Sequence, residues 1–292
     1  SEPNARYGYR LWVALIALMV GGFFLLAYVL WSAYQDVWAD ARLVASSQAE
    51  MLDARFDATL RRVEATLDDL AVRIPVEAYG ASGIDDFRGS IEGELERIRQ
   101  AFPEVAGFRV VNAAGDLLYR SGDGGYTNIA DRSYFRSLKE NPAAGLVFSE
   151  VLVSRITGRP TLVAARAVRT HQGRFVGLIS AAIELTYFEA LFSSARVGAS
   201  GALAIWHSDL HTLVVHHPPI PGDLNQQLDP QHPILQRFQA GERQGIIEFN
   251  AQVDGVRRVY AFRQLQRYPF FVQAGLAKED VMAAWRQRVL LV

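Results

Sequence analysis

The chain of 292 residues has no cysteine. This absence excludes disulfide bonds, thiolate catalysis and cysteine-ligated metal sites. An excess of positive charge is also missing, because the formal net charge is -1 and the basic residues are scattered along the sequence. Proteins that bind nucleic acid usually present a basic face. We therefore expect no nucleic acid among the partners.

The sequence also lacks the motifs of common catalytic sites, since it has no glycine-rich phosphate loop, no Ser-His-Asp order and no paired catalytic carboxylates. His207, His211, His216 and His217 are close in sequence, with Asp209 between them. Imidazole and carboxylate groups can bind zinc or copper. The adjacent His216 and His217, however, should point to opposite faces of a strand. We expect no catalytic residue, no cofactor and no metal site in this segment.

Charged residues are absent between Leu11 and Trp31. At about 1.5 Å per residue, a helix of this length spans the ~30 Å hydrocarbon core of a bilayer. The run therefore predicts a transmembrane helix over residues 11–31 and the lipid bilayer as a partner. Arg6 and Arg10 precede the span, and positive residues favour the cytoplasmic side. We expect residues 1–10 in the cytoplasm and the rest in the periplasm, with the chain anchored in a bacterial inner membrane.

Glycine and proline are absent from Trp31 to Ile74, which favours one continuous stalk helix over residues 32–74. Its apolar residues are spaced by four or three positions, as in the seam of a coiled coil. They are Leu52, Phe56, Leu60, Val63, Leu67 and Leu70. The stripe predicts a homodimer through the stalk helix. The alternative is that it packs against its own domain.

The rest of the chain alternates short strand-like runs, tight turns and short helices, which indicates an α+β fold with antiparallel sheets. Helices are expected near residues 84–102 and 131–138, and strands near residues 145–153, 160–168 and 175–185. A similar order of elements then repeats, with strands near residues 202–206, 211–216, 245–250, 255–263 and 270–276. We predict two tandem modules, one over residues 75–190 that is distal to the membrane and one over residues 191–280 that is proximal.

The last residues, 281–292, end in the apolar run Val289-Leu290-Leu291-Val292. We interpret this segment as the start of a second transmembrane helix. An ordinary apolar C-terminal turn is the alternative.

Three motifs resemble the distal module of a double Cache domain, and their order and spacing match as well. They are Asp131-Arg132-Ser133-Tyr134-Phe135, the run from Ser154 to Pro160 and the run from Gly173 to Ile179. Double Cache domains are PAS-like extracytoplasmic sensors of bacterial diguanylate cyclases, histidine kinases and chemoreceptors. The resemblance implies a small ligand held between the sheet and a capping loop and helix.

The resemblance implies that Arg132, Tyr134 and Phe135 lie at that helix, with Tyr126 on the loop before it. A guanidinium binds two oxygens at once, so it suits a carboxylate or another small oxyanion. In the alternative interpretation, Arg132 pairs with a nearby carboxylate and the two aromatic residues belong to the core. Asp131 would then cap the helix.

Amino-acid-binding members of the family hold the ligand's ammonium group with acidic residues on the sheet. Ser154 and Ala182 occupy those positions here, and neither can neutralise a cation. Arg155 favours anions further if it points inward. We therefore expect a small anionic ligand, such as a carboxylate without an α-amino group.

These features predict the ligand-sensing region of a membrane-bound receptor. The segment itself is expected to be non-catalytic, and the resemblance favours a cytoplasmic diguanylate cyclase output ahead of a histidine kinase. Two other classes stay open: a ligand-free structural and dimerisation module, and a membrane-anchored hydrolase.

Overall fold

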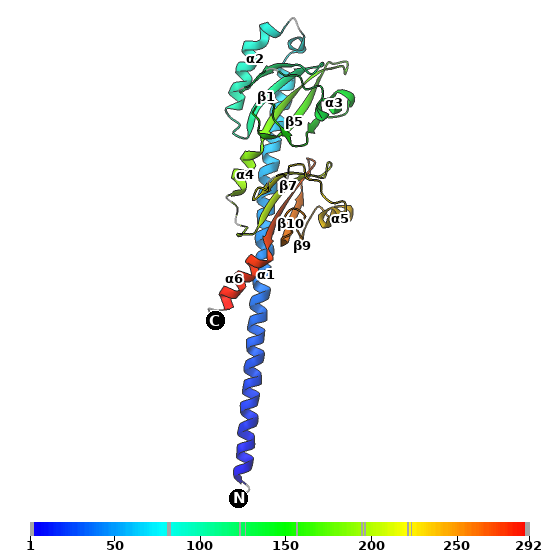
Figure 1. Cartoon of the computed structure of the whole chain (residues 1–292). Helices are drawn as coiled ribbons and strands as arrows, with labels where there is room; N and C mark the ends of the chain where they lie inside the picture. The colour runs from blue at the N-terminus through cyan, green and yellow to red at the C-terminus, as the bar shows by residue number, and fades with distance from the viewer. Residues whose placement is uncertain are drawn as a thin grey trace.

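The computed structural model describes residues 3–80, 83–122, 124–125, 127–155, 157–193, 195, 197–220, 222 and 224–289. Two α+β modules lie one after the other along the C-terminal half of a single long helix, and the N-terminal half of that helix projects away from them (Figure 1). The module beside the C-terminal end of this helix is called distal, and the other is called proximal.

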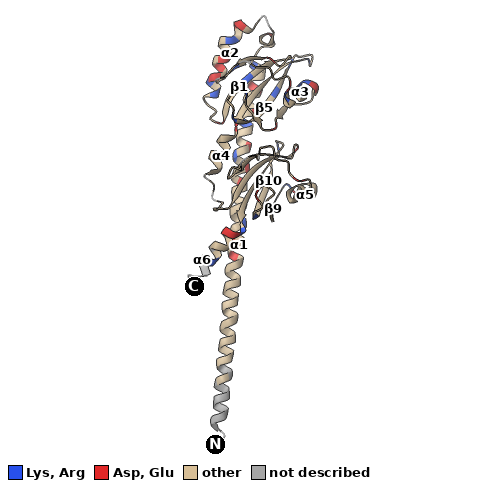
Figure 2. Cartoon of the chain, in the orientation of Figure 1, with Lys and Arg blue, Asp and Glu red and all other residues tan. Residues whose placement is uncertain are grey.

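Helix α1 runs without interruption from Pro3 to Arg73. One helix in the described part is long and apolar enough to cross a membrane: within Leu15–Arg73, an 18-residue window has a mean hydropathy of 2.2 and no buried residue. In Figure 2 the described lower part of α1 is tan, the colour of residues other than Lys, Arg, Asp and Glu. The exposed apolar surface therefore belongs to the predicted span and not to the core.

The upper part of α1 buries the predicted apolar stripe, because it packs against both sheets through β5, β6, β10 and β11. Phe56, Leu60, Val63 and Leu67 are fully buried. Phe56 contacts Phe188 and Phe270, with ring centroids 5.2 Å away in each case. The stripe thus forms the core of its own chain, as the alternative interpretation held. The homodimer stays a prediction.

The distal module follows η1 (Val76–Tyr79) and α2 (Ile84–Arg99). Its remaining elements are β1 (Val105–Asn112), β2 (Leu117–Arg120), α3 (Ser133–Glu140), β3 (Leu146–Phe148), β4 (Leu152–Val153), β5 (Pro160–Arg169) and β6 (Phe175–Glu184). The sheet is antiparallel with the order β2-β1-β6-β5-β3, and β4 also pairs with β5.

Helix α4 (Leu185–Ser193) leads to the proximal module. Its elements are β7 (Ala202–His207), β8 (Thr212–His217), α5 (Pro233–Gln239), β9 (Gln244–Asn250), β10 (Arg257–Gln264) and β11 (Phe270–Ala277). The sheet has the order β8-β7-β11-β10-β9 and is antiparallel throughout.

In both sheets, the strand that comes last in the chain lies in the middle. β6 lies between β1 and β5, and β11 lies between β7 and β10. The predicted fold class is confirmed: a long N-terminal apolar helix precedes two antiparallel α+β modules. One predicted strand, over residues 145–153, is divided into β3 and β4. At the break, the hydroxyl of Ser149 accepts the hydrogen bond from the Val163 amide, at 3.0 Å. The Ser149 amide still donates to the Val163 carbonyl at 2.9 Å, so the side chain replaces only one of the two ladder bonds at this point.

The two modules contact each other directly. Asn225, in the loop after β8, accepts a hydrogen bond from the Val151 amide at 2.9 Å and donates one to the Val151 carbonyl at 2.7 Å. The ring of Phe148 packs against Tyr268 and Phe270 of the proximal module. Helix α6 (Lys278–Val289) then follows β11 and packs against α1.

Candidate ligand site in the distal module

The two faces of the distal sheet have different chemistry. Phe108 and Val110 of β1 belong to the main core, which includes the buried stripe of α1. Arg109 lies between them, and alternation along a strand turns its side chain to the opposite face. There it lies beside Ser180 of β6 and Arg120 of β2, its partners in register. This second face of the sheet is covered by α3 and by the loop before it.

A cavity of about 60 Å³ opens between this face of the sheet, α3 and the link after β4. Its wall consists of Arg109, Thr127, Ile129, Arg132, Tyr134, Leu152, Val153, Ser154, Arg155, Thr161, Val163 and Ala182. The structure therefore brings four of the predicted site residues to one cavity: Arg132, Tyr134, Ser154 and Arg155.

Arg132 occupies the N-cap position of α3, with extended backbone angles of φ -76° and ψ 139°. Its side chain makes no capping hydrogen bond, and it is half-buried. Its carbonyl accepts the first helical bond, from the Arg136 amide at 3.2 Å. Arg132, and not Asp131, therefore occupies the N-cap position, and its side chain is part of the cavity wall.

Tyr134 and Phe135 are adjacent in α3, but only Tyr134 lines the cavity. Tyr134 is 6% exposed, and burial raises the pKa of its hydroxyl, so it stays protonated and can donate a hydrogen bond. Phe135 is turned into the core, where its ring lies 5.8 Å from that of Phe175. Tyr126, the other predicted aromatic residue, lies outside the described residues.

Arg155 connects the link after β4 to the loop before α3. Its guanidinium forms an ion pair with Asp131 at 2.6 Å and donates to the Asn128 carbonyl at 3.0 Å. The hydrogen bond from Arg155 lowers the pKa of Asp131, and the same bond raises the pKa of Arg155. Both side chains are largely exposed. Arg155 therefore closes one side of the cavity while its charge is already shared with Asp131.

Arg109 is a site residue that the sequence analysis missed. Burial lowers the pKa of its guanidinium, while the proximity of Tyr134 raises it and that of Arg120 lowers it further. The available signal was a charged residue between the apolar neighbours Phe108 and Val110, inside a strand. A charge at a half-buried strand position requires a partner, a solvent path or a function.

No aspartate or glutamate belongs to the described wall of the cavity. Ser154 and Ala182, which occupy the positions of acidic residues in amino-acid-binding relatives, both line it. The wall therefore offers guanidinium and hydroxyl groups but no carboxylate. Such a wall can accept the oxygens of an anion, and it lacks a group to neutralise an ammonium.

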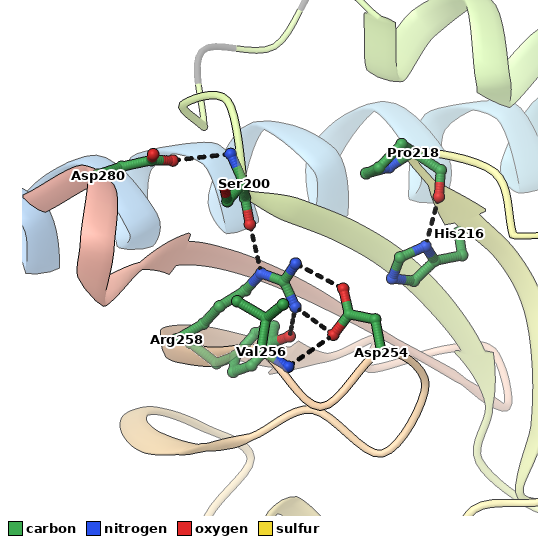
Figure 3. A network of polar contacts seen from close by, with 8 residues as sticks. Ser200, His216, Pro218, Asp254, Val256, Arg258 and Asp280 are labelled. Carbon is green, nitrogen blue, oxygen red and sulfur yellow. Dashed lines mark hydrogen bonds and ion pairs between the residues drawn. The ribbon is translucent and has the colours of Figure 1, made fainter.

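A second polar cluster lies in the proximal module (Figure 3). Arg258 of β10 is buried and forms two hydrogen bonds with Asp254, at 2.8 and 2.6 Å. It also donates to the Ser200 carbonyl at 2.7 Å and to the Tyr260 hydroxyl at 3.2 Å. The Ser200 amide in turn donates to Asp280 in the first turn of α6, at 2.8 Å. The carboxylate of Asp254 neutralises this arginine, and four of its five N–H groups are bonded within the protein.

The histidines do not gather into a ligand set. Nδ1 of His207 accepts from the Leu210 amide at 3.2 Å, and Nδ1 of His216 lies 2.7 Å from the Pro218 carbonyl. Within the described residues, no three histidine, aspartate or glutamate side chains are placed to hold a metal ion.

Comparison with known proteins gives one family match, since a profile described as a Cache domain matches residues 31–285. No curated protein shows significant similarity to the chain. The structure resembles the extracellular domain of rpHK1S-Z16, assigned as a histidine kinase, with a TM-score of 0.72 and 21% identity. The match covers 85% of this chain and 99% of that one.

Two chemoreceptor domains show the same fold at lower identity. The periplasmic sensory domain of Tlp1 from Campylobacter jejuni gives a TM-score of 0.66 at 10% identity, covering 84% of this chain and 98% of that one. The ligand-binding domain of CtaA from Pseudomonas fluorescens, in complex with L-isoleucine, gives 0.56 at 13% identity, covering 86% and 96%.

Proposed function

Because the chain belongs to the double Cache family of extracytoplasmic sensor domains, we propose that it senses a small anionic ligand, such as a carboxylate, in its distal module. Arg132 and Tyr134 contact the ligand, Ser154 contributes a hydroxyl, and Arg155 closes the site through Asp131. Phe135 supports Tyr134 from the core. Tyr126 stays in the proposal on the resemblance alone.

The observation that carries this proposal is the charge of the cavity wall. Its described residues include three arginines and no carboxylate. Charge-assisted hydrogen bonds from a guanidinium are roughly twice as strong as neutral ones. The amino acids in the CtaA complexes, L-isoleucine among them, carry an ammonium group as well as a carboxylate. The wall described here has no counter-charge for that ammonium, so we propose a carboxylate without an α-amino group.

The proposal places the sensor in the periplasm of a bacterium, anchored in the inner membrane by residues 11–31. Residues 32–74 form the stalk, residues 75–190 the distal module and residues 191–280 the proximal module. Residues 1–10 are cytoplasmic and residues 281–292 begin a second span.

Signalling in this proposal uses a homodimer through the stalk helix and a cytoplasmic output, for which the resemblance favours a diguanylate cyclase. The ligand changes the receptor only as far as it binds one conformation more tightly than the other. The link after β4 and the helix α3 contact the ligand from the side that faces away from α1.

Replacing Arg132 with alanine tests the proposed site. A charge-assisted hydrogen bond contributes about 1.5–3 kcal/mol, and ~1.4 kcal/mol corresponds to a factor of ten in affinity. We expect Arg132→Ala to weaken carboxylate binding at least ~tenfold, and Arg132→Lys to restore part of the loss because a lysine lacks the two-pronged geometry. Binding is measured as the increase in unfolding temperature of the full chain in detergent, with acetate and propionate as probes.

Arg136 provides the matched control, because it is an exposed arginine one helical turn after Arg132. Arg136→Ala should leave the acetate response unchanged. If Arg132→Ala responds like the parent, the site lies elsewhere. If none of acetate, propionate, malonate and succinate stabilises the parent chain, the ligand-free dimerisation module becomes the better interpretation.

A further inference from the structure

The arginines in the described part of the chain differ in whether their guanidinium groups have a hydrogen-bond or ion-pair partner within the protein. Most arginines that are buried or half-buried donate a hydrogen bond or form an ion pair within the chain. These are Arg88, Arg99, Arg120, Arg166, Arg169, Arg258 and Arg263. Among the described residues, only the guanidinium groups of Arg109 and Arg132 have no such partner at this degree of burial. Both exceptions line the same cavity.

Arg258 is an example of a buried arginine with a structural role, and its partners differ from those of Arg109. Asp254 holds it with two hydrogen bonds, and Ser200 and Tyr260 accept one each (Figure 3). Arg109 has neither a carboxylate nor a carbonyl in that role among the described residues. Its neighbours in register are Ser180 and the cationic Arg120.

Arg109 also borders a wider hollow at the outer edge of the sheet, which contains two carboxylates. Both are already paired, since Glu96 binds Arg99 at 2.5 Å and Glu184 binds Arg159 at 3.0 Å. The hollow therefore supplies no spare counter-charge for Arg109.

A half-buried guanidinium without a paired carboxylate costs free energy, because water solvates it only in part. This applies most to Arg109, since Arg132 also has the neighbouring carboxylate of Asp131, which is already paired with Arg155. An anion bound in the cavity removes this cost. Arg132 approaches the cavity from the N-cap of α3, and Arg109 approaches it from β1 in the sheet. Two cations on two different walls match an anion that carries charge at both ends.

The small volume of the cavity favours a short anion. A volume of about 60 Å³ corresponds to roughly four to six water-sized volumes. We propose that the distal cavity takes a short dicarboxylate of about two to four carbons, with one carboxylate held by Arg132 and the other by Arg109. This proposal rests on the proposed carboxylate-binding function. In it, Arg109 determines whether the site prefers a ligand with two negative charges to a ligand with one.

The test compares malonate and succinate with acetate and propionate, using the full chain in detergent and following the unfolding temperature as each is titrated. In the parent, at least one dicarboxylate should bind ~tenfold or more tightly than the monocarboxylates. Arg109→Gln should abolish this preference, weakening the dicarboxylate ~tenfold or more while changing acetate affinity less than ~threefold. Arg136→Gln is the control and should change neither.

The ligand-free unfolding temperature separates a ligand group from a structural one. Because no partner among the described residues depends on Arg109, ligand-free Arg109→Gln should unfold at the parent temperature or above it. A clear decrease would show a structural role and overturn the proposal. If this variant does not fold, Arg109→Lys is measured instead, and it should bind the dicarboxylate more weakly than the parent; parent affinity would overturn the proposal.

The outcomes separate this proposal from the proposed function. Two outcomes would overturn the dicarboxylate proposal: equal binding of mono- and dicarboxylates by the parent, or parent-like dicarboxylate affinity in Arg109→Gln. The proposed carboxylate-binding function would still hold in either case, provided that binding requires Arg132. An equal loss of acetate and malonate in Arg109→Gln means that both arginines hold one charge, which also overturns the dicarboxylate proposal. Absence of any binding that depends on Arg132 overturns the proposed function itself.

Discussion

His232 holds the first turn of α5 through its ring. Its Nδ1 accepts a hydrogen bond from the Ile234 amide at 3.3 Å, and the ring packs edge-on against Phe249, with centroids 4.8 Å apart. Burial lowers the pKa of His232 to about 4, against an opposing contribution from Asp229. Both the cap and the packing therefore need the neutral ring.

This requirement predicts a dependence of stability on pH. In the unfolded chain, His232 has the ordinary histidine pKa of ~6.5. Between pH 6.5 and pH 4 it is therefore protonated in the unfolded chain but neutral in the folded chain. The contribution of His232 is complete above pH 6.5 and is lost as the pH falls toward 4. His232→Asn keeps a capping oxygen but cannot titrate. Its unfolding temperature, followed by circular dichroism, should fall less steeply from pH 7 to pH 4.5 than that of the parent.

His171→Asn serves as the control for that series, because His171 is exposed in the turn between β5 and β6. It should keep the parent's slope. Identical slopes for the parent and His232→Asn would show that the capping histidine does not titrate on unfolding.

Residues of the candidate site could be predicted from the sequence where they belong to a motif or lie at the start of a predicted helix. Arg132, Tyr134 and Arg155 were found in this way, and the structure brings them to one cavity. Arg109 was missed because its position depends on the register of β1 with β6, which the sequence alone does not give. Phe135 follows Tyr134 directly, but a rotation of about 100° per helical residue turns it toward the core.

At the scale of elements, one side chain makes the hydrogen bonds to Val151 by which the loop after β8 contacts the distal module. Asn225 makes both of its hydrogen bonds to the backbone of Val151, and it has a positive φ of 57°, which asparagine tolerates better than alanine. Val151 is buried beside the short strand β4, so an unpaired amide there would be costly.

Asn225→Ala should therefore lower the free energy of unfolding by about 1–3 kcal/mol, the cost of leaving buried polar groups unpaired. Asn225→Gly loses the same hydrogen bonds but tolerates the positive φ, so it should be less destabilising than alanine. Urea unfolding of the full chain measures both. Parent-like stability of the alanine variant would show that water replaces the side chain and that the modules are not joined here.

Helices and strands could be predicted from the sequence where the apolar pattern extends over many residues. The stripe on α1 is buried as its period indicates, and the strands β5, β6, β10 and β11 begin and end within about two residues of the predicted bounds. The division between β3 and β4 was not predictable, because it depends on Ser149 reaching the backbone of β5. Whether the α1 stripe served a dimer or its own core also depended on tertiary structure, which shows it buried within the chain.

For the whole molecule, the missing cysteine makes the topology directly testable. Gln172 is exposed in the turn between β5 and β6, and Gln172→Cys would be the only thiol in the chain. A membrane-impermeant maleimide should label it in intact spheroplasts, because the distal module is proposed to lie in the periplasm. Labelling only after lysis would place the module in the cytoplasm. The parent, which has no thiol, gives the background.

The continuity of α1 fixes how far the distal cavity stands from the lipid. Asp68 of α1 forms an ion pair with Arg166 of β5 at 2.6 Å, so this level of the helix marks the height of the distal sheet. With the proposed span ending at Trp31, the rise of ~1.5 Å per residue gives a height of roughly 55 Å. Surface potential decays over a Debye length of about 8 Å in physiological salt. Lipid headgroup charge therefore neither repels nor enriches an anion at this height, and the sensor samples the bulk concentration of its ligand.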